Sequence, residues 1–262
     1  MLDGFHYEVS GEGEPLVLIH EGIADSRMWD PQVAAFAGRH RVVRYDLRGF
    51  GRSRLEPGKV SFRGDLLALL DHLAIDRAAL VGASLGGGIA LEVALTAPER
   101  VRALVLVGTG LPEHEWSPEM QAREEEEETA LERGDVEAAI EMNLRVWVDG
   151  PGRIPDDVDP AVRALVREML RRMYELQLPL GDSVSVQRLD PPISARLDEI
   201  QAPTLVVLGE EDVPDIHQIG RRLAGAIQSA RLATIPNAAH LPNLERPDEF
   251  NRLVLGFLDA LG

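Results

Sequence analysis

The sequence predicts an α/β fold in which a mostly parallel sheet carries helices on both faces and is interrupted by a helical insertion. Two observations lead to this prediction. Over the first 110 residues, short apolar runs alternate with helix-like stretches, a pattern typical of βαβ units and therefore of a parallel sheet. After residue 110 the strand-like runs stop, and they return only at residue 204.

Six short runs have the character of buried parallel strands, because they are apolar, rich in β-branched residues and bounded by glycine or charged residues. They cover 16–20, 41–45, 78–82, 101–107, 204–208 and 230–235. Helices are expected between or after these runs, over 31–38, 62–73, 85–97 and 248–261. In the last helix, Phe250, Leu253, Val254 and Phe257 have the spacing of one apolar helix face.

Residues 111–196 contain no convincing strand. They read as three helices, over 117–133, 136–148 and 160–177. A segment of this length without structure of its own would be unusual in a compact domain, so we expect a helical cap over a binding site. The core is then expected at 1–110 and 197–262, and the cap at 111–196.

Composition excludes several classes of function. The chain of 262 residues has no cysteine, which excludes disulfides, thiolate metal sites and a cysteine nucleophile. Its net charge of −17 argues against nucleic acid and membrane as partners, because both attract positive surfaces. No apolar run approaches the roughly 20 residues that cross a bilayer, and the first residues lack the features of a secretory signal. A cytoplasmic location is therefore expected.

The sequence predicts neither a metal ion nor an organic cofactor. Its longest acidic run is five consecutive glutamates, 124–128. Consecutive residues of a helix point in all directions rather than converging on one ion, so we interpret this run as a solvated helix face. The expected partner is a small-molecule substrate, bound by a monomer or a homodimer.

Ser84 is the candidate nucleophile. It lies in Gly82-Ala83-Ser84-Leu85-Gly86, a G-x-S-x-G motif directly after an expected strand and before an expected helix. Small residues two positions before and after the serine leave room for a sharp turn that lifts its hydroxyl clear of the sheet. The alternative is a glycine-rich turn in which the serine only caps a helix. A dinucleotide site is disfavoured, because the G-x-G-x-x-G spacing is absent.

His240 is the candidate base among seven histidines, because it lies in a loop between the last expected strand and the last helix. Loops at the carboxyl edge of a parallel sheet are where ligand-facing residues collect. His114 and His217 are alternatives at the edge of the site.

Asp212 is the candidate acid that supports the histidine. It belongs to the acidic stretch Glu210-Glu211-Asp212, which follows the strand-like run 204–208 and precedes a helix that starts with proline. The position before Val-Pro is expected at the tip of the loop, which favours Asp212 over its two neighbours. The resulting order of serine, aspartate and histidine is that of α/β-hydrolases.

An acyl-transfer site also needs two backbone N–H groups that stabilise the developing oxyanion. Leu85, directly after Ser84, is expected to supply one. Gly22, in the loop after the first buried strand, is expected to supply the other, with Glu21 as the alternative.

Several large apolar residues are candidates for the substrate pocket, although core packing explains them equally well. They are Met28, Trp29, Trp116, Met142 and Trp147. Residues beside the expected triad and oxyanion loop complete the candidates for the pocket: Glu21, Ile23, Val213 and Leu241.

In these motifs the chain resembles the α/β-hydrolases, a group that includes esterases, enol-lactonases, carbon–carbon bond hydrolases and cofactor-free haloperoxidases. Four blocks carry the resemblance: 18–22 with 25–29, 45–53, 82–86 and 237–247. The resemblance implies a mostly parallel eight-stranded sheet with a helical cap inserted after strand 6, and a structural turn at 46–53. It disfavours dehalogenases and epoxide hydrolases, whose nucleophile is an aspartate where this chain has Ser84.

One departure from the family bears on the substrate. The family usually has His-Gly in the oxyanion loop, and here Glu21 replaces that glycine. A carboxylate near the mouth of the site should repel anions, so the sequence favours hydrolysis of a neutral carboxylic ester or lactone. A carbon–carbon bond hydrolase or a cofactor-free perhydrolase on the same triad remains an alternative. A ligand receptor with the same fold and no turnover is the alternative from another class.

Overall fold

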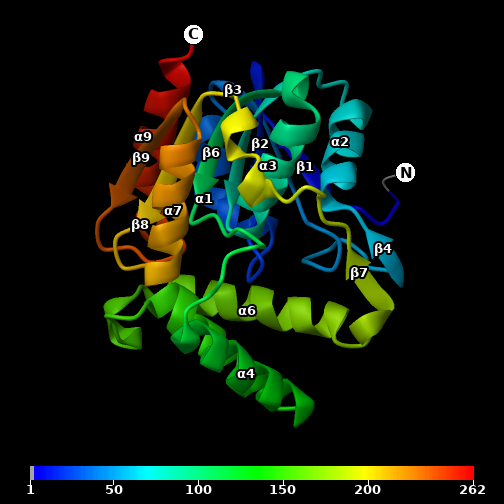
Figure 1. Ribbon diagram of the computed structural model, residues 1–262, viewed down its shortest axis with the longest axis vertical. Helices are drawn as coiled ribbons and strands as arrows, with labels where there is room; N and C mark the ends of the chain where they lie inside the picture. Colours follow the sequence, from blue (N-terminus) through cyan, green and yellow to red (C-terminus); the bar gives the residue numbers. More distant parts are fainter. Residues whose placement is uncertain (1–2) are drawn as a thin grey trace.

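The computed structural model describes residues 3–262 (Figure 1). Seven strands form one sheet in the order β1-β3-β2-β5-β6-β8-β9, and all neighbours are parallel except β1 and β3. The strands are β1 (Tyr7–Ser10), β2 (Glu14–Ile19), β3 (His40–Tyr45), β5 (Ala78–Ala83), β6 (Val101–Val107), β8 (Thr204–Gly209) and β9 (Ala230–Ile235). The six strands expected from the apolar runs are confirmed.

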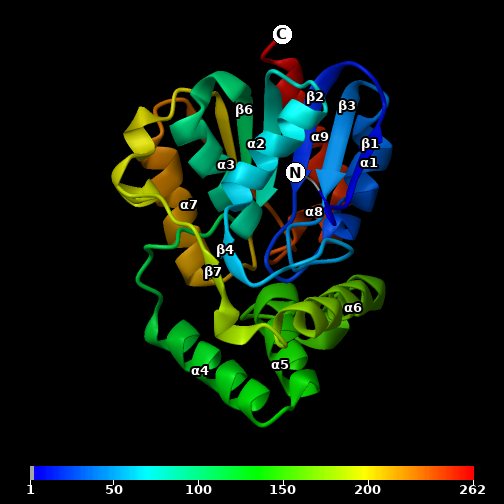
Figure 2. The same ribbon diagram turned by 90° about the vertical axis from the view of Figure 1, so that its right-hand side faces the viewer.

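Helices cover both faces of the sheet (Figure 2). On one face lie α2 (Phe62–His72), α3 (Leu85–Thr96) and α7 (Pro214–Ala226), and on the other lie α1 (Asp30–Phe36), α8 (Pro242–Glu245) and α9 (Pro247–Asp259). Side chains along each strand alternate between the two faces, as the pleat requires. In β2, Leu16 and Leu18 join the core under α1 and α9, whereas Val17 and Ile19 join the core under α2 and α3.

The described residues form a main sheet of seven strands, so the expected number of eight is wrong. The segment before β1 does not add a strand, because its carbonyl groups bond to the loop after β3. The Gly4 carbonyl accepts from the Arg54 N–H at 2.8 Å, and the His6 carbonyl accepts from the Asp46 N–H at 3.0 Å. β1 is therefore the edge of the sheet.

The segment between β6 and β8 is mostly helical. We use the name inserted helices for α4 (Pro118–Glu132), α5 (Val136–Asn143), the π-helical turn Leu144–Asp149 and α6 (Pro160–Gln177). The three helices expected here are confirmed. They lie below the carboxyl ends of the parallel strands, where a ligand of an open α/β sheet binds (Figures 1 and 2).

The expectation that residues 111–196 contain no strand is wrong. β7 (Val184–Val186) pairs in parallel with β4 (Gly58–Val60), and the two form a separate sheet. Each strand has three residues and is largely exposed, so neither has the apolar run by which a buried strand is recognised. The pair joins the segment after the inserted helices to the core beside α2.

A buried carboxylate holds the turn after β3 together. Asp46 accepts hydrogen bonds from the Ser26 N–H at 2.9 Å and from the Arg52 N–H at 2.8 Å. Gly51 has a φ of +50°, and a Cβ at this position would lie 2.3 Å from Asp46 Oδ2, so the turn requires glycine. These contacts fix the loop that borders the oxyanion segment.

Within residues 3–262, no helix has the length and apolar character to cross a bilayer.

Replacing Asp46 by alanine should lower the free energy of unfolding by about 2–3 kcal/mol, because two N–H groups lose their buried acceptor. Urea denaturation measures the loss. Asp71→Ala serves as the control, because the Asp71 carboxylate is mostly exposed in its 2.9 Å pair with Arg100. That pair should contribute about 1 kcal/mol or less. Equal losses in the two variants would contradict the structural role of Asp46.

Candidate active site

Ser84 lies in a strained turn between β5 and α3. Its φ of 46° and ψ of −109° place it outside the regions that residues with side chains prefer. The chain makes this turn because Gly82 and Gly86 have no Cβ. A Cβ at Gly82 would lie 2.3 Å from the Gly86 carbonyl oxygen, and one at Gly86 would lie 2.4 Å from the Ile19 carbonyl oxygen. Strain of this kind is concentrated at functional sites.

The turn places the start of α3 beside the candidate nucleophile. The first N–H groups of a helix have no partner inside the helix, and they favour negative charge. Gly87 and Gly88, the two glycines that follow Gly86 on α3, have different surroundings. A Cβ at Gly87 would lie 2.0 Å from Thr109 Oγ1, so this glycine permits close packing of α3. Gly88 instead lines the cavity that also contains Ser84.

Asp212 and His240 form a buried pair. His240 Nδ1 lies 2.8 Å from Asp212 Oδ2, and Asp212 Oδ1 accepts from the Val213 N–H at 2.8 Å. Because an ionised carboxylate only accepts, Nδ1 carries the proton and Nε2 is left as the basic nitrogen. Glu210 is exposed and Glu211 makes no contact of this kind, so Asp212 is the member of the acidic stretch that reaches the imidazole.

The position of His240 is fixed by contacts with Trp147 and Gly108. Its N–H donates to the Trp147 carbonyl at 3.2 Å, and its ring packs against the Trp147 indole with centroids 4.6 Å apart. On another side, a Cβ at Gly108 would lie 3.0 Å from His240 Nδ1 and Cε1. Trp147 belongs to the π-helical turn, so the inserted helices contact the candidate base directly.

The loop after β2 lies against the turn at Ser84. His20 Nε2 accepts from the Leu47 N–H at 2.9 Å, and its Nδ1 lies 2.7 Å from the Glu21 carbonyl, to which it donates. The buried imidazole thereby fixes the backbone of the loop. A Cβ at Gly22 would lie 4.0 Å from the Leu85 side chain, so the two expected oxyanion donors belong to neighbouring segments.

Glu21 is a buried carboxyl group beside the base. Both of its oxygens are buried without a hydrogen-bond partner in the described structure, and Oε2 lies 3.9 Å from His240 Nε2. Burial raises the pKa of Glu21 to about 7, with the positive charge of His240 opposing that effect and Asp212 adding to it. Burial alone would lower the pKa of His240, but the Asp212 and Glu21 carboxylates raise it.

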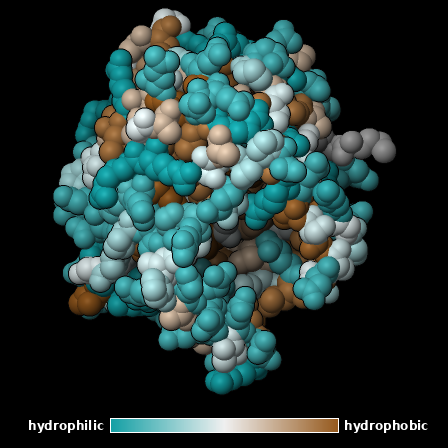
Figure 3. Space-filling view, viewed as in Figure 1, coloured by the Kyte–Doolittle hydropathy of each residue, from teal (hydrophilic) through white to brown (hydrophobic). Residues whose placement is uncertain are grey.

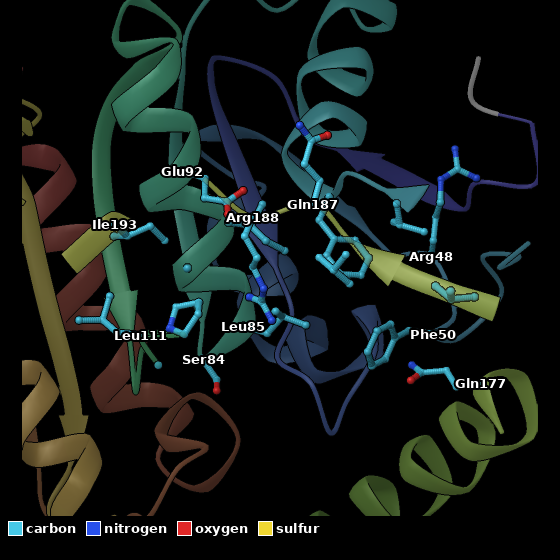
Figure 4. A pocket seen from close by; sticks show the side chains of 18 of the residues that line it. Arg48, Phe50, Ser84, Leu85, Glu92, Leu111, Gln177, Gln187, Arg188 and Ile193 are labelled. Carbon is cyan, nitrogen blue, oxygen red and sulfur yellow. The ribbon is translucent and has the colours of Figure 1, made fainter. Parts of the chain in front are cut away.

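Ser84 opens into a cavity of about 410 Å³ (Figure 4). Figure 3 shows hydrophobic residues in a hollow on a surface that is otherwise mostly hydrophilic. The lining is mainly apolar: Phe50, Leu55, Val60, Phe62, Leu85, Ile89, Leu111, Trp116 and Ile193 belong to it. A cavity of this size and character suits a small organic substrate.

Two of the three charged groups in the cavity wall, Arg48 and Glu92, face groups of opposite charge, whereas Arg188 has no ion pair within residues 3–262. Arg48 Nε donates to both carboxylate oxygens of Asp65, each at 3.0 Å. Glu92 has Arg63 Nη1 at 3.9 Å. Among residues 3–262, no cluster of three or more His, Cys, Asp or Glu residues is arranged to hold a metal ion. The wall therefore carries one unpaired charge among the described residues, the Arg188 guanidinium.

The structure separates the expected pocket residues. Trp116 lines the main cavity, and it lines a second cavity of about 220 Å³ together with Met142 and Trp147. Val213 borders a third cavity, of about 280 Å³. Ile23 is partly buried and packs against the core under α1 and α9.

Three of the expected pocket residues lie elsewhere. Met28, Trp29 and Leu241 are completely buried in the core under α1 and α9, where Trp29 packs against Phe250. Their expected place in the pocket is corrected to core packing, the alternative that large apolar side chains always leave open. Glu21 likewise borders His240 and not the main cavity.

Sequence patterns did not identify several cavity residues. Arg48, Glu92, Gln177, Gln187 and Arg188 line the cavity, and they come from four separate segments of the chain. Glu92 had one available signal, since it lies eight residues after Ser84 on the same face of α3. The alternative histidines are placed outside the main cavity. His114 contacts Asp215 at 3.1 Å, and His217 contacts the Glu210 carbonyl at 3.2 Å.

Comparison with known proteins shows what the chain is similar to. The alpha/beta hydrolase fold family matches residues 14–247. A protein of Variovorax paradoxus named as a carbamate hydrolase, RutD, is 34% identical over 97% of this chain and 95% of its own length. The 2-hydroxy-6-oxononadienedioate/2-hydroxy-6-oxononatrienedioate hydrolase of Burkholderia vietnamiensis is 32% identical, over 97% and 90% of the two chains.

A solved structure is also similar to this chain over nearly its whole length. The enol-lactonase of Burkholderia xenovorans has a TM-score of 0.79 and 29% sequence identity, covering 97% of this chain and 96% of the enol-lactonase. These relatives act on different bonds, so the likeness by itself selects no substrate.

Glu21→Gln should move the acid limb of the kcat/KM profile to lower pH. His240 acts as a base only when neutral, so activity is lost as the pH falls through its pKa. Glu21 is one of two carboxylates that raise this pKa, and its removal lowers it. Initial rates on an uncharged ester across pH 5 to 10 measure the limb (a range of about five units around ordinary histidine values).

Glu210→Gln is the matched control, because this carboxylate is exposed and belongs to the same loop as Asp212. Its profile should coincide with that of the unaltered protein. If the acid limb of the kcat/KM profile did not move in Glu21→Gln, Glu21 would have no influence on the pKa of His240. Because glutamine is close in size to glutamate, thermal unfolding of both variants should confirm an intact fold.

Proposed function

Because this chain belongs to the α/β-hydrolase fold family, we propose that it is a serine hydrolase that cleaves a neutral carboxylic ester or lactone through an acyl-enzyme on Ser84. The observation that carries the proposal is the buried Asp212–His240 pair, held at the same edge of the sheet as the strained serine turn. A serine hydroxyl needs such a base to become a nucleophile.

The first half of the reaction acylates Ser84. His240 Nε2 takes the hydroxyl proton while Ser84 Oγ attacks the carbonyl carbon, and the Asp212 carboxylate stabilises the imidazolium. The amides of Leu85 and Gly22 hold the negative oxygen of the tetrahedral intermediate. His240 then gives its proton to the leaving alkoxide, and the alcohol departs or, from a lactone, stays attached to the acyl group.

The second half releases the acid. Water gives a proton to His240 Nε2 as its oxygen attacks the acyl carbon, and the same donors hold the second oxyanion. The bond between Ser84 Oγ and the acyl carbon breaks, and His240 returns the proton to the serine. The contact between His240 and Trp147 supports a cap at 111–196 over this chemistry.

The cavity supports a neutral substrate, but for a different reason than the sequence suggested. Glu21 is buried beside Nε2 of His240 and does not line the main cavity, so its charge does not guard the mouth. Instead, the mainly apolar wall and the pairing of Arg48 with Asp65 and of Glu92 with Arg63 support it, and Arg188 is the one charge in the wall without a partner among the described residues. Taking a charged group out of water into such a cavity is costly unless it is paired.

A carbon–carbon bond hydrolase is the second candidate. It is supported by the 32% identity to a relative whose name describes hydrolysis of a dienedioate. The same triad serves both reactions, and specificity depends on the pocket. Release of an alcohol from an ester, compared with cleavage of a vinylogous 1,5-diketone, separates the two.

Ser84→Ala should reduce turnover by about 10⁶-fold and Asp212→Asn by about 10⁴-fold, because the first removes the nucleophile and the second leaves the imidazole without its anionic support. Stopped-flow release of p-nitrophenol from short-chain esters measures both. In the unaltered protein a burst should precede the steady state if acylation is faster than deacylation.

Glu211→Gln is the control for the acid, since it removes a carboxylate from the adjacent position in the same loop. It should change turnover by less than about tenfold, as expected for a group outside the reacting network. If Glu211→Gln were the more damaging substitution, the assignment of Asp212 would be overturned.

A neutral ester should be cleaved with higher kcat/KM than an ester of equal size that carries a carboxylate on its acyl chain. The expected difference is at least about tenfold, corresponding to roughly 1.4 kcal/mol of unpaired charge in the cavity. Competition between the two esters in one reaction measures it. Preference for the anion would contradict the neutral substrate class.

A further inference from the structure

Three charged residues lie in or behind the cavity wall, away from Ser84. We use the name distal polar cluster for Arg63, Glu92 and Arg188. Glu92 and Arg188 line the cavity, and Figure 4 shows both side chains in it together with Ser84. Arg63 lies behind Glu92, with Nη1 at 3.9 Å from Glu92 Oε2. The cluster combines an acceptor and donors in an otherwise apolar space.

Helix geometry sets the distance between this cluster and the nucleophile. Ser84, Gly88 and Glu92 are spaced four residues apart on α3, and all three line the cavity. At a rise of 1.5 Å per residue, the Cα atoms of Ser84 and Glu92 are about 12 Å apart. Gly88 has no side chain, so between Ser84 and Glu92 the wall that α3 contributes is formed by the apolar side chains of Leu85 and Ile89.

The polar groups of the cluster are poorly satisfied. The Glu92 side chain is 10% exposed, and no hydrogen bond of the described structure reaches its carboxyl group. The buried Arg63 Nη1 also has no hydrogen-bond partner, and 3.9 Å is too long for a direct bond to Glu92. Burial raises the pKa of Glu92, with Arg63 and Arg188 opposing it and Glu113 adding to it.

A carboxylate that is 10% exposed, with its nearest cation 3.9 Å away and no hydrogen-bond donor, is compensated only in part for its desolvation and contributes little to the stability of the fold. A contribution to packing would not explain the choice of glutamate at this position either, because apolar residues surround it on α3. A bound group that donates a hydrogen bond would satisfy the carboxylate. Arg188 has no hydrogen bond or ion pair within residues 3–262, and Figure 4 shows its guanidinium directed toward Leu85, so it is free to donate to a group bound between Leu85 and Glu92.

We propose that the distal polar cluster is a subsite for a hydroxyl group at the far end of the acyl chain of the substrate. The hydroxyl donates to the Glu92 carboxylate and accepts from the Arg188 guanidinium. The hydroxyl thereby uses both its donor and its acceptor function. A carboxylate would meet the negative charge of Glu92, and a methyl group would leave the cluster unsatisfied. This inference rests on the proposed acyl-enzyme chemistry at Ser84 and specifies its substrate class.

The test compares p-nitrophenyl esters of ω-hydroxyalkanoic acids with the unsubstituted esters of equal length, from four to ten carbons. The ratio of kcat/KM for the hydroxylated ester over the plain ester should reach about 10- to 100-fold at one chain length, because a hydrogen bond to a charged group is worth this much discrimination. The ratio should approach one at the shortest length, whose hydroxyl cannot reach Glu92.

Two variants assign the preference to the cluster. In Glu92→Leu the ratio should fall to about one, and in Glu92→Gln it should be intermediate, because the amide still offers an acceptor. Glu113→Gln removes an exposed carboxylate that also acts on Glu92 through its charge, and it should keep the ratio of the unaltered protein. Ser84-dependent cleavage of the plain esters in each variant shows that the fold and the chemistry are intact.

The remaining outcomes overturn the inference in distinguishable ways. Cleavage of plain esters with no hydroxyl preference at any length removes the subsite and leaves the esterase function standing. A preference that persists in Glu92→Leu assigns it to another part of the cavity. Stronger preference for ω-carboxylated esters shows that the arginines dominate. If no ester is cleaved in a Ser84-dependent way, the proposed function fails and the subsite with it.

Discussion

The backbone conformation of Ser84 is the constraint on which the rest of the site depends. A positive φ at a residue with a side chain costs on the order of 1–3 kcal/mol, which the surroundings must offset. Gly82 and Gly86 permit the turn, and the Ser84 N–H is held by the Val107 carbonyl at 2.8 Å. The sharp turn aims α3 along the cavity, so it positions the nucleophile, the helix N-terminus and Glu92 together.

Features encoded in short stretches of sequence could be predicted. The central parallel strands β2, β5, β6 and β8 are nearly continuous apolar runs, because both of their faces are covered by helices. The turn at Ser84 needs glycine at fixed positions, and His240 and Asp212 each follow a strand at the edge where ligands bind. The hydrogen bond between them joins residues 28 positions apart, yet their places in the topology already indicated that they meet.

Features that depend on packing between distant segments could not be predicted from the sequence. β4 and β7 are short, exposed strands whose pairing is created by tertiary structure. Met28 and Trp29 are of residue types that occur in pockets and in cores alike, and they are buried by tertiary packing with segments far along the chain, including α8 and Phe250 of α9. The cavity unites side chains from β4, α3, α6 and the segment after β7, so its polar residues carry no pattern along the chain.

The distribution of the site along the chain has a consequence for biosynthesis. Ser84 and its turn are completed early, whereas His240 follows β9, the last strand of the sheet, and only α8 and α9 come after it. A chain that folds as it leaves the ribosome therefore displays a serine without a base until its final segment docks. Under the mechanism proposed above, a nascent chain that ends before β9 lacks its base and does not yet cleave esters.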